Sequence, residues 1–159
     1  MHCQPIDTID WHTELKTVGV GRDQVPRLIV PLAVVNELDR KKFEGGDIPR
    51  GRAQKAIKSL RELRQSVTAD APVIVKAAGG SVVTLEIPRD DIGRTPMSDG
   101  DNELIEFGQF LKRAGHRAVV IVTRDLTLQI RAERAGLEVI WLNDKYHKDK
   151  AAAAADSAR

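Results

Sequence analysis

Two apolar runs of this sequence end in the same way, and together they limit the fold that the chain can adopt. Residues 28–35 lead into Glu37 and Asp39, and residues 118–122 lead into Asp125. An unbroken Val/Ile/Leu run is typical of a strand buried on both faces, as in the middle of a parallel sheet. Binding sites in open α/β sheets lie beyond the carboxyl ends of such strands, so we expect these acids at one sheet edge.

The composition indicates one folded domain. The chain has 159 residues, of which 42% are hydrophobic and 30% charged, a balance typical of globular proteins. Cys3 is the only cysteine and cannot form an intrachain disulfide, which fits a reducing compartment. No apolar stretch approaches the ~20 residues of a membrane span. We therefore expect a cytoplasmic protein without a membrane segment, a single domain over residues 1–147, and a disordered tail over residues 148–159.

The spacing of apolar residues predicts strands alternating with helices. The predicted strands are 27–35, 73–75, 82–87, 118–122 and 137–142, and the predicted helices are 34–43, 50–65, 101–114 and 126–135. A hairpin is expected around Gly79 and Gly80. This alternation favours an α/β fold of three layers, α/β/α, with a mostly parallel central sheet.

Three acids are candidate ligands of a divalent metal ion: Glu37, Asp101 and Asp125. Mg²⁺ and Mn²⁺ prefer hard oxygen ligands, so a site for phosphate chemistry needs carboxylates from different elements. Each acid also has a purely structural explanation. Asp101 and Asp125 precede predicted helices, where Asp is a favoured N-cap, and Glu37 would lie in a first helical turn, where the helix dipole favours an anion.

A basic stretch follows the first acidic block. Nine Lys and Arg side chains lie between residues 40 and 64, and such a stretch beside an acidic cluster can hold a phosphate backbone. The candidate nucleic-acid-binding residues are Arg40, Lys41, Lys42, Arg50 and Arg52. The alternative is an ordinary solvated helix face.

Three blocks of this sequence, residues 31–40, 101–105 and 120–128, resemble successive blocks of a PIN domain, and the resemblance extends over roughly residues 28–142. It implies a PIN-like, metal-dependent ribonuclease, often the toxin of a toxin–antitoxin pair, that uses Mg²⁺ or Mn²⁺. It also implies that Glu37, Asp101 and Asp125 are catalytic metal ligands and that Thr123 is a polar neighbour of the site. RNA would be the substrate, and an antitoxin protein or a second copy of the chain would be partners.

The start of the sequence departs from the family pattern. A PIN domain opens with a buried central strand that ends in Asp, whereas residues 1–5 cannot supply such a strand and Asp7 only imitates its last residue. We therefore expect the N-terminal strand to be missing from this chain. The alternative function is a catalytically inactive PIN-like module that binds RNA or protein. A third, weaker alternative is a flavodoxin-like module whose acids are helix caps.

Overall fold

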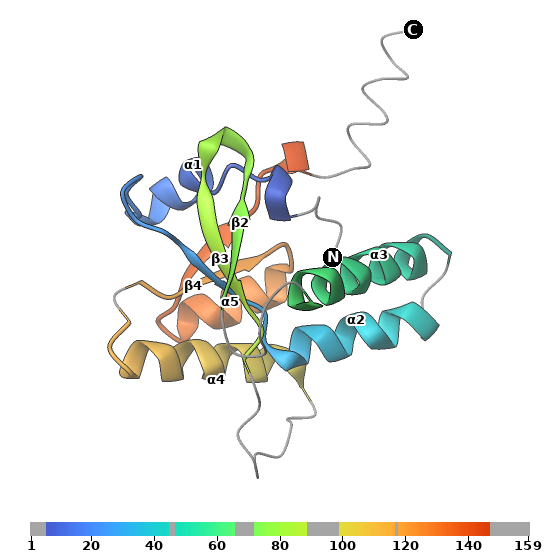
Figure 1. The fold of residues 1–159 in the computed structure, drawn as a ribbon. Helices are drawn as coiled ribbons and strands as arrows, with labels where there is room; N and C mark the ends of the chain where they lie inside the picture. The colour runs from blue at the N-terminus through green and yellow to red at the C-terminus, as the bar shows by residue number, and fades with distance from the viewer. Residues whose placement is uncertain (1–5, 45–46, 66–71, 89–98, 117, 147–159) are drawn as a thin grey trace, which may run out of the picture. The chain divides into compact units, whose positions relative to one another are not determined.

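The computed structural model describes residues 6–44, 47–65, 72–88, 99–116 and 118–146. Figure 1 shows their helices and strands along the chain. The chain divides into two compact units. The three-strand unit consists of residues 25–75 and 82–104, and the two-strand unit consists of residues 1–24, 76–81 and 105–159. No helix in the described ranges is both long enough and apolar enough to cross a lipid bilayer.

The sheet of the three-strand unit has the order β1-β3-β2. Strand β1 (Arg27–Ile29) pairs in parallel with β3 (Val82–Glu86), with Leu28 opposite Leu85. Strand β2 (Val73–Lys76) lies on the other side of β3, to which a short connection joins it, as the predicted hairpin requires. Alternate residues of β3 are buried, so one face of this strand points into the core.

The sequence predicts a strand over residues 27–35, but β1 ends at Ile29 and helix α2 (Leu32–Glu44) follows. Pro31 explains the change, because proline has no N–H group to add to a sheet ladder. The carbonyl of Pro31 instead accepts a hydrogen bond from the N–H of Val34, at 3.0 Å. The prediction of strand up to residue 35 is therefore wrong, and this apolar run is mostly helical.

Helix α3 (Asp47–Gln65) packs against α2. Leu38 of α2 and Ala53 of α3 are buried, as expected for amphipathic helices that turn their apolar stripes inward. The predicted helix over residues 50–65 is confirmed, and it begins three residues earlier.

The sheet of the two-strand unit is a parallel pair, β4 (Val120–Thr123) and β5 (Glu138–Trp141), joined through α5 (Leu126–Arg134). Parallel strands need such a crossover helix. Helix α4 (Gly100–Arg113) enters this unit from Ile105 onward. A close approach of α4 to the strand pair depends on Gly108.

A Cβ atom at Gly108 would lie 2.9 Å from Leu137 Cδ1 and 3.6 Å from Ile121 Cδ1. A side chain at this position would therefore require the end of the Leu137 side chain to shift. Ala132 of α5 and Ile140 of β5 are buried in the same unit.

The N-terminal segment of the two-strand unit is helical. It contains η1 (Ile6–Thr8), α1 (Trp11–Leu15) and η2 (Lys16–Val18). Residues 6–24 hold no strand, and Asp7 lies exposed in η1. Asp7 therefore does not stand at the end of a buried strand.

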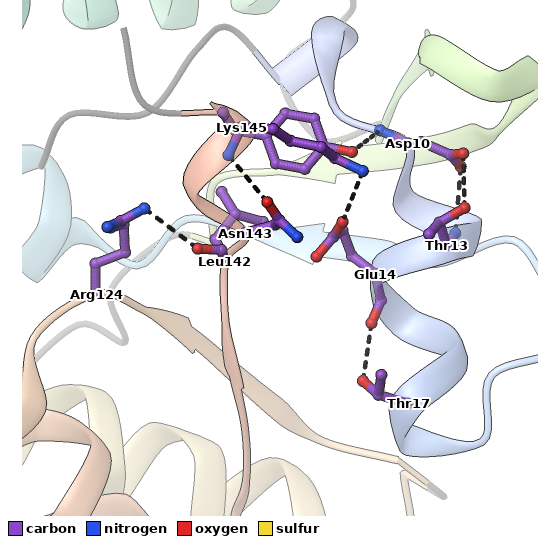
Figure 2. A network of polar contacts seen from close by, with 9 residues as sticks. Asp10, Thr13, Glu14, Thr17, Arg124, Leu142, Asn143 and Lys145 are labelled. Carbon is purple, nitrogen blue, oxygen red and sulfur yellow. Dashed lines mark hydrogen bonds and ion pairs between the residues drawn. The ribbon is translucent and has the colours of Figure 1, made fainter. Parts of the chain in front are cut away.

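The C-terminal segment η4 (Asp144–Tyr146) meets α1 through polar contacts. The backbone N–H of Asp10 donates to the hydroxyl of the buried Tyr146 at 3.1 Å. Lys145 points toward Glu14 of α1, with 3.4 Å between Nζ and Oε1 (Figure 2). These contacts tie the two ends of the described chain together within one unit.

The predicted α/β class with mostly parallel strand pairing is confirmed. Within the described residues the strands form two short sheets, one of three strands and one of two, where the sequence predicted one central sheet. The predicted tail, residues 148–159, lies outside the described residues.

Candidate active site

Asp125 lies at the turn between β4 and α5, with its backbone in an extended conformation. Its Oδ1 accepts hydrogen bonds from the N–H groups of Thr127, at 2.8 Å, and Leu128, at 3.1 Å. The N-cap explanation for Asp125 is therefore confirmed. Both bonds go to Oδ1, so the cap does not use Oδ2 of this exposed side chain. Capping and metal binding are thus compatible at this residue.

Thr123 supports the same turn. It is the last residue of β4, and its Oγ1 accepts a hydrogen bond from the N–H of Asp125 at 3.0 Å. Two local hydrogen-bonding arrangements therefore fix the backbone around Asp125, one from the preceding threonine and one from the start of α5. A carboxylate on a backbone fixed in this way is held in place, as a metal ligand must be.

Glu37 lies in the second turn of α2, because that helix begins at Leu32. The sequence placed it in the first turn, so this prediction is wrong by one turn. Its carboxylate is engaged by two cations on the same helix, with 3.1 Å from Arg40 Nε to Oε2 and 3.1 Å from Lys41 Nζ to Oε1. Partial burial pushes the pKa of Glu37 upward, but the hydrogen bonds from Lys41 and Arg40 outweigh burial and the pKa lies below its ordinary value.

Asp101 lies half-buried in the first turn of α4. Its backbone N–H donates to Asp99 Oδ1 at 3.0 Å, and the N–H of Glu103 donates to the Asp99 carbonyl at 3.2 Å. The capping explanation therefore belongs to Asp99, one residue before the helix, and not to Asp101. Asp101 remains close to the helix N-terminus, where an anion is favoured.

Sequence reasoning missed a buried acid two residues after Asp101. Glu103 is only 8% exposed. Its position in the sequence could have predicted this burial, because Phe107 and Leu111 follow Glu103 at intervals of four residues. Residues spaced by four lie on one face of a helix, so Glu103 is on the apolar face that the sequence predicts for α4.

The structure divides the predicted site residues between its units. Glu37 and Asp101 belong to the three-strand unit, whereas Thr123 and Asp125 belong to the two-strand unit. Over the described ranges, no three His, Cys, Asp or Glu side chains gather in a group that could hold a metal ion. The carboxylate oxygens have the chemistry that Mg²⁺ and Mn²⁺ prefer, but their meeting around one ion stays a prediction.

The predicted nucleic-acid-binding cations lie on α2 and α3. Arg40 and Lys41 pair with Glu37, and Lys42 Nζ lies 2.8 Å from Asp39 Oδ1. Arg50 is exposed and Arg52 is half-buried at the start of α3. An open cleft along the two helices has three cationic lining residues, which are Lys42, Lys58 and Arg61. Sequence reasoning had not singled out the last two.

The comparison with known families decides which class of protein this is. A family model described as PIN domain matches residues 6–142. The chain belongs to the PIN domain family. The match covers described residues of both units. No curated protein and no solved structure gave a match to this chain.

Proposed function

We propose that this PIN domain is a metal-dependent endoribonuclease that hydrolyses RNA phosphodiester bonds. The observation that carries the proposal is the family match over residues 6–142. The Thr123–Asp125 turn supports it, because this turn presents a fixed carboxylate at the carboxyl end of a parallel strand. Membership of this family makes RNA the substrate to test first.

In this proposal Glu37, Asp101 and Asp125 hold one or two Mg²⁺ or Mn²⁺ ions, and Thr123 keeps the Asp125 turn in place. A bound divalent ion would polarise the phosphodiester and lower the pKa of a water molecule. The acids alone would repel an RNA backbone, so activity requires the metal.

The basic side chains of α2 and α3 would hold the RNA backbone. The candidates remain Arg40, Lys41, Lys42, Arg50 and Arg52, and the cleft adds Lys58 and Arg61. Because phosphate contacts release counterions, RNA affinity should fall as salt rises. A role as a toxin with an antitoxin partner, or as a homodimer, belongs to the same proposal.

The alternative is a catalytically inactive PIN module that binds RNA or protein. It is favoured by one observation: both carboxylate oxygens of Glu37 are engaged by cations, Oε2 by Arg40 and Oε1 by Lys41. In that case the same basic surface would bind RNA without cutting it.

The test is cleavage of an end-labelled single-stranded RNA by the purified chain with Mn²⁺, with Mg²⁺ and with EDTA. The Asp125→Asn variant keeps a residue that caps helices well but removes the charge that a metal needs. We expect it to lower the cleavage rate by about 100-fold, since loss of a group that only orients a metal ligand already costs about 10–100-fold.

The matched control is Glu133→Gln, which makes the same loss of charge near the other end of α5, where Glu133 is exposed. It should cleave at the rate of the parent chain. RNA binding without cleavage in any metal would support the inactive module. Equal cleavage rates for Asp125→Asn and Glu133→Gln would remove Asp125 from the mechanism.

A further inference from the structure

The two tryptophans of this chain differ in environment. Trp11 is 5% exposed, and its Nε1 donates to the Ile6 carbonyl at 2.9 Å. Trp141 is 44% exposed at the end of β5. Tryptophan side chains are highly buried on average, and Trp141 departs from this pattern. A large aromatic side chain left half in solvent calls for an explanation.

The strand geometry explains why Trp141 points outward. Ile140 is 5% exposed and Leu142 is 2% exposed. Successive side chains of a strand alternate between its faces, so burial of both neighbours directs the indole away from that core. Its exposure therefore follows from the backbone of β5 and does not require a mobile side chain.

An arginine lies over the indole. The guanidinium carbon of Arg124 is 5.7 Å from the centre of the Trp141 ring, within the range of a cation–π contact. Arg124 Nη1 also donates to the Leu142 carbonyl at 3.3 Å (Figure 2). The hydrogen bond helps to hold the guanidinium over the ring. The pair presents an aromatic plane and a cationic plane together.

This pair stands next to the predicted catalytic turn. Trp141 is opposite Thr123 in the β4–β5 register, and Arg124 lies between Thr123 and Asp125 in the chain. Both belong to the two-strand unit. A ligand bound on the indole would therefore lie beside Asp125.

We propose that Trp141 and Arg124 form a stacking platform for one unpaired base of the RNA, beside the phosphodiester that is cut. This inference rests on the proposed function. Proteins that bind single-stranded RNA stack its bases on aromatic rings and arginine planes. The guanidinium also suits a nearby phosphate, so the pair complements a nucleotide better than an apolar peptide. The platform restricts the substrate to RNA that is unpaired at this nucleotide.

The first experiment uses the tryptophan fluorescence of the Trp11→Phe variant, in which Trp141 is the only indole. Titration with single-stranded RNA in EDTA should quench its emission, because a base stacks on the ring. A duplex of the same sequence should leave the emission unchanged. The Trp141→Phe variant, which keeps only the buried Trp11, should show no quenching with either RNA.

The second experiment measures RNA affinity by fluorescence anisotropy. Base stacking is worth about 1–3 kcal/mol per base, which predicts that Trp141→Ala weakens single-strand binding by about 5- to 150-fold. Trp141→Phe should retain affinity within about 3-fold, because a ring remains. Ile130→Ala is the matched control, since Ile130 is a similarly exposed apolar residue, at 42%, on α5 of the same unit.

An RNA with one abasic nucleotide distinguishes base stacking on Trp141 from a merely structural role of this residue. If Trp141 stacks one base, an RNA lacking that base should bind the parent chain and Trp141→Ala equally. Unchanged emission on RNA binding, or equal weakening of single-strand and duplex binding by Trp141→Ala, would overturn the platform. If Trp141→Ala still cleaves RNA and binds it with unchanged affinity, the stacking platform is refuted and the proposed function is not. Absence of both binding and cleavage in the parent chain would refute the proposed function as well.

Discussion

Replacing Gly79 by alanine should disturb helix α1, although Gly79 is far from it in the sequence. Gly79 has φ +66°, in the left-handed region, and a Cβ atom there would lie 2.5 Å from the carboxylate of Asp10. That carboxylate caps α1, with Oδ1 3.2 Å from the N–H of Thr13 and Oδ2 2.7 Å from its hydroxyl. The methyl group can be accommodated only if the Asp10 side chain moves and the cap is lost.

The neighbouring Gly80 supplies the matched control. It also has a positive φ, +73°, but a Cβ atom there would meet no atom within 4 Å. Alanine in the left-handed region costs roughly 1–2 kcal/mol, and loss of an N-cap costs about 1 kcal/mol more. We therefore expect Gly80→Ala to lower the free energy of unfolding by about 1 kcal/mol and Gly79→Ala by about 2 kcal/mol.

Thermal denaturation of both variants, alone and combined with Asp10→Ala, separates the two contributions. A chain of this size loses about 2–4 °C of melting temperature per kcal/mol, so the variants should differ by a few degrees. In the Asp10→Ala background there is no carboxylate to displace, and Gly79→Ala should cost no more than Gly80→Ala. If the two glycine variants are equally stable when Asp10 is present, the contact between Asp10 and the 78–80 turn contributes nothing to the free energy of unfolding.

Two further predictions concern single caps. Asp125→Ala should lower the free energy of unfolding by about 1 kcal/mol, because α5 loses the cap on Thr127 and Leu128. Asp125→Asn should lower it by only a few tenths of a kcal/mol. Thermal denaturation compares the two variants, and equal losses of stability would contradict the capping role. The hydrogen bond from the Thr13 hydroxyl is the largest effect on the pKa of Asp10 and lowers it. A carboxyl group whose pKa is lowered in the folded state stabilises the fold at pH values above its ordinary pKa, near 3.8. This stabilisation is lost as the pH falls through the pKa of the folded state. The stability difference between the parent and Thr13→Val should therefore shrink on acidification in denaturation curves, and a difference that grows would refute the assignment.

Local signals in the sequence predicted much of the fold correctly. Helix α5 follows a capping Asp125 and ends at Arg134, two residues before Gly136, which has φ +77°. An Asp before a helix and a Gly just after it are ordinary helix boundaries. The apolar run before Asp125 is a strand as predicted, whereas the run containing Pro31 is not. One difference between the two runs is Pro31, which has no N–H group to extend a sheet ladder.

The candidate site could be predicted only in its local parts. Arg40 and Lys41 follow Glu37 by three and four residues, a spacing that predicts ion pairs along a helix. Sequence reasoning instead treated the acid and the cations as separate groups. The exposure of Trp141 depends on which neighbours face the core of its own unit. The meeting of acids from distant segments depends on tertiary packing, about which periodicity within one segment gives no information.

The ion pairs of Glu37 are consistent with its proposed role as a metal ligand. The Glu37 carboxylate pairs with Arg40 and Lys41, whose charges balance its own and lower its pKa. If an RNA phosphate approaches together with a divalent ion, the guanidinium can pair with the phosphate while the carboxylate turns to the metal, so every charge keeps a partner of opposite sign. The exchange costs little because Arg40 and Glu37 are 61% and 40% exposed, and exposed ion pairs are worth only ~0–1 kcal/mol. Binding of the metal and binding of RNA would then each raise the affinity for the other, because each ligand pairs with one member of the same ion pair.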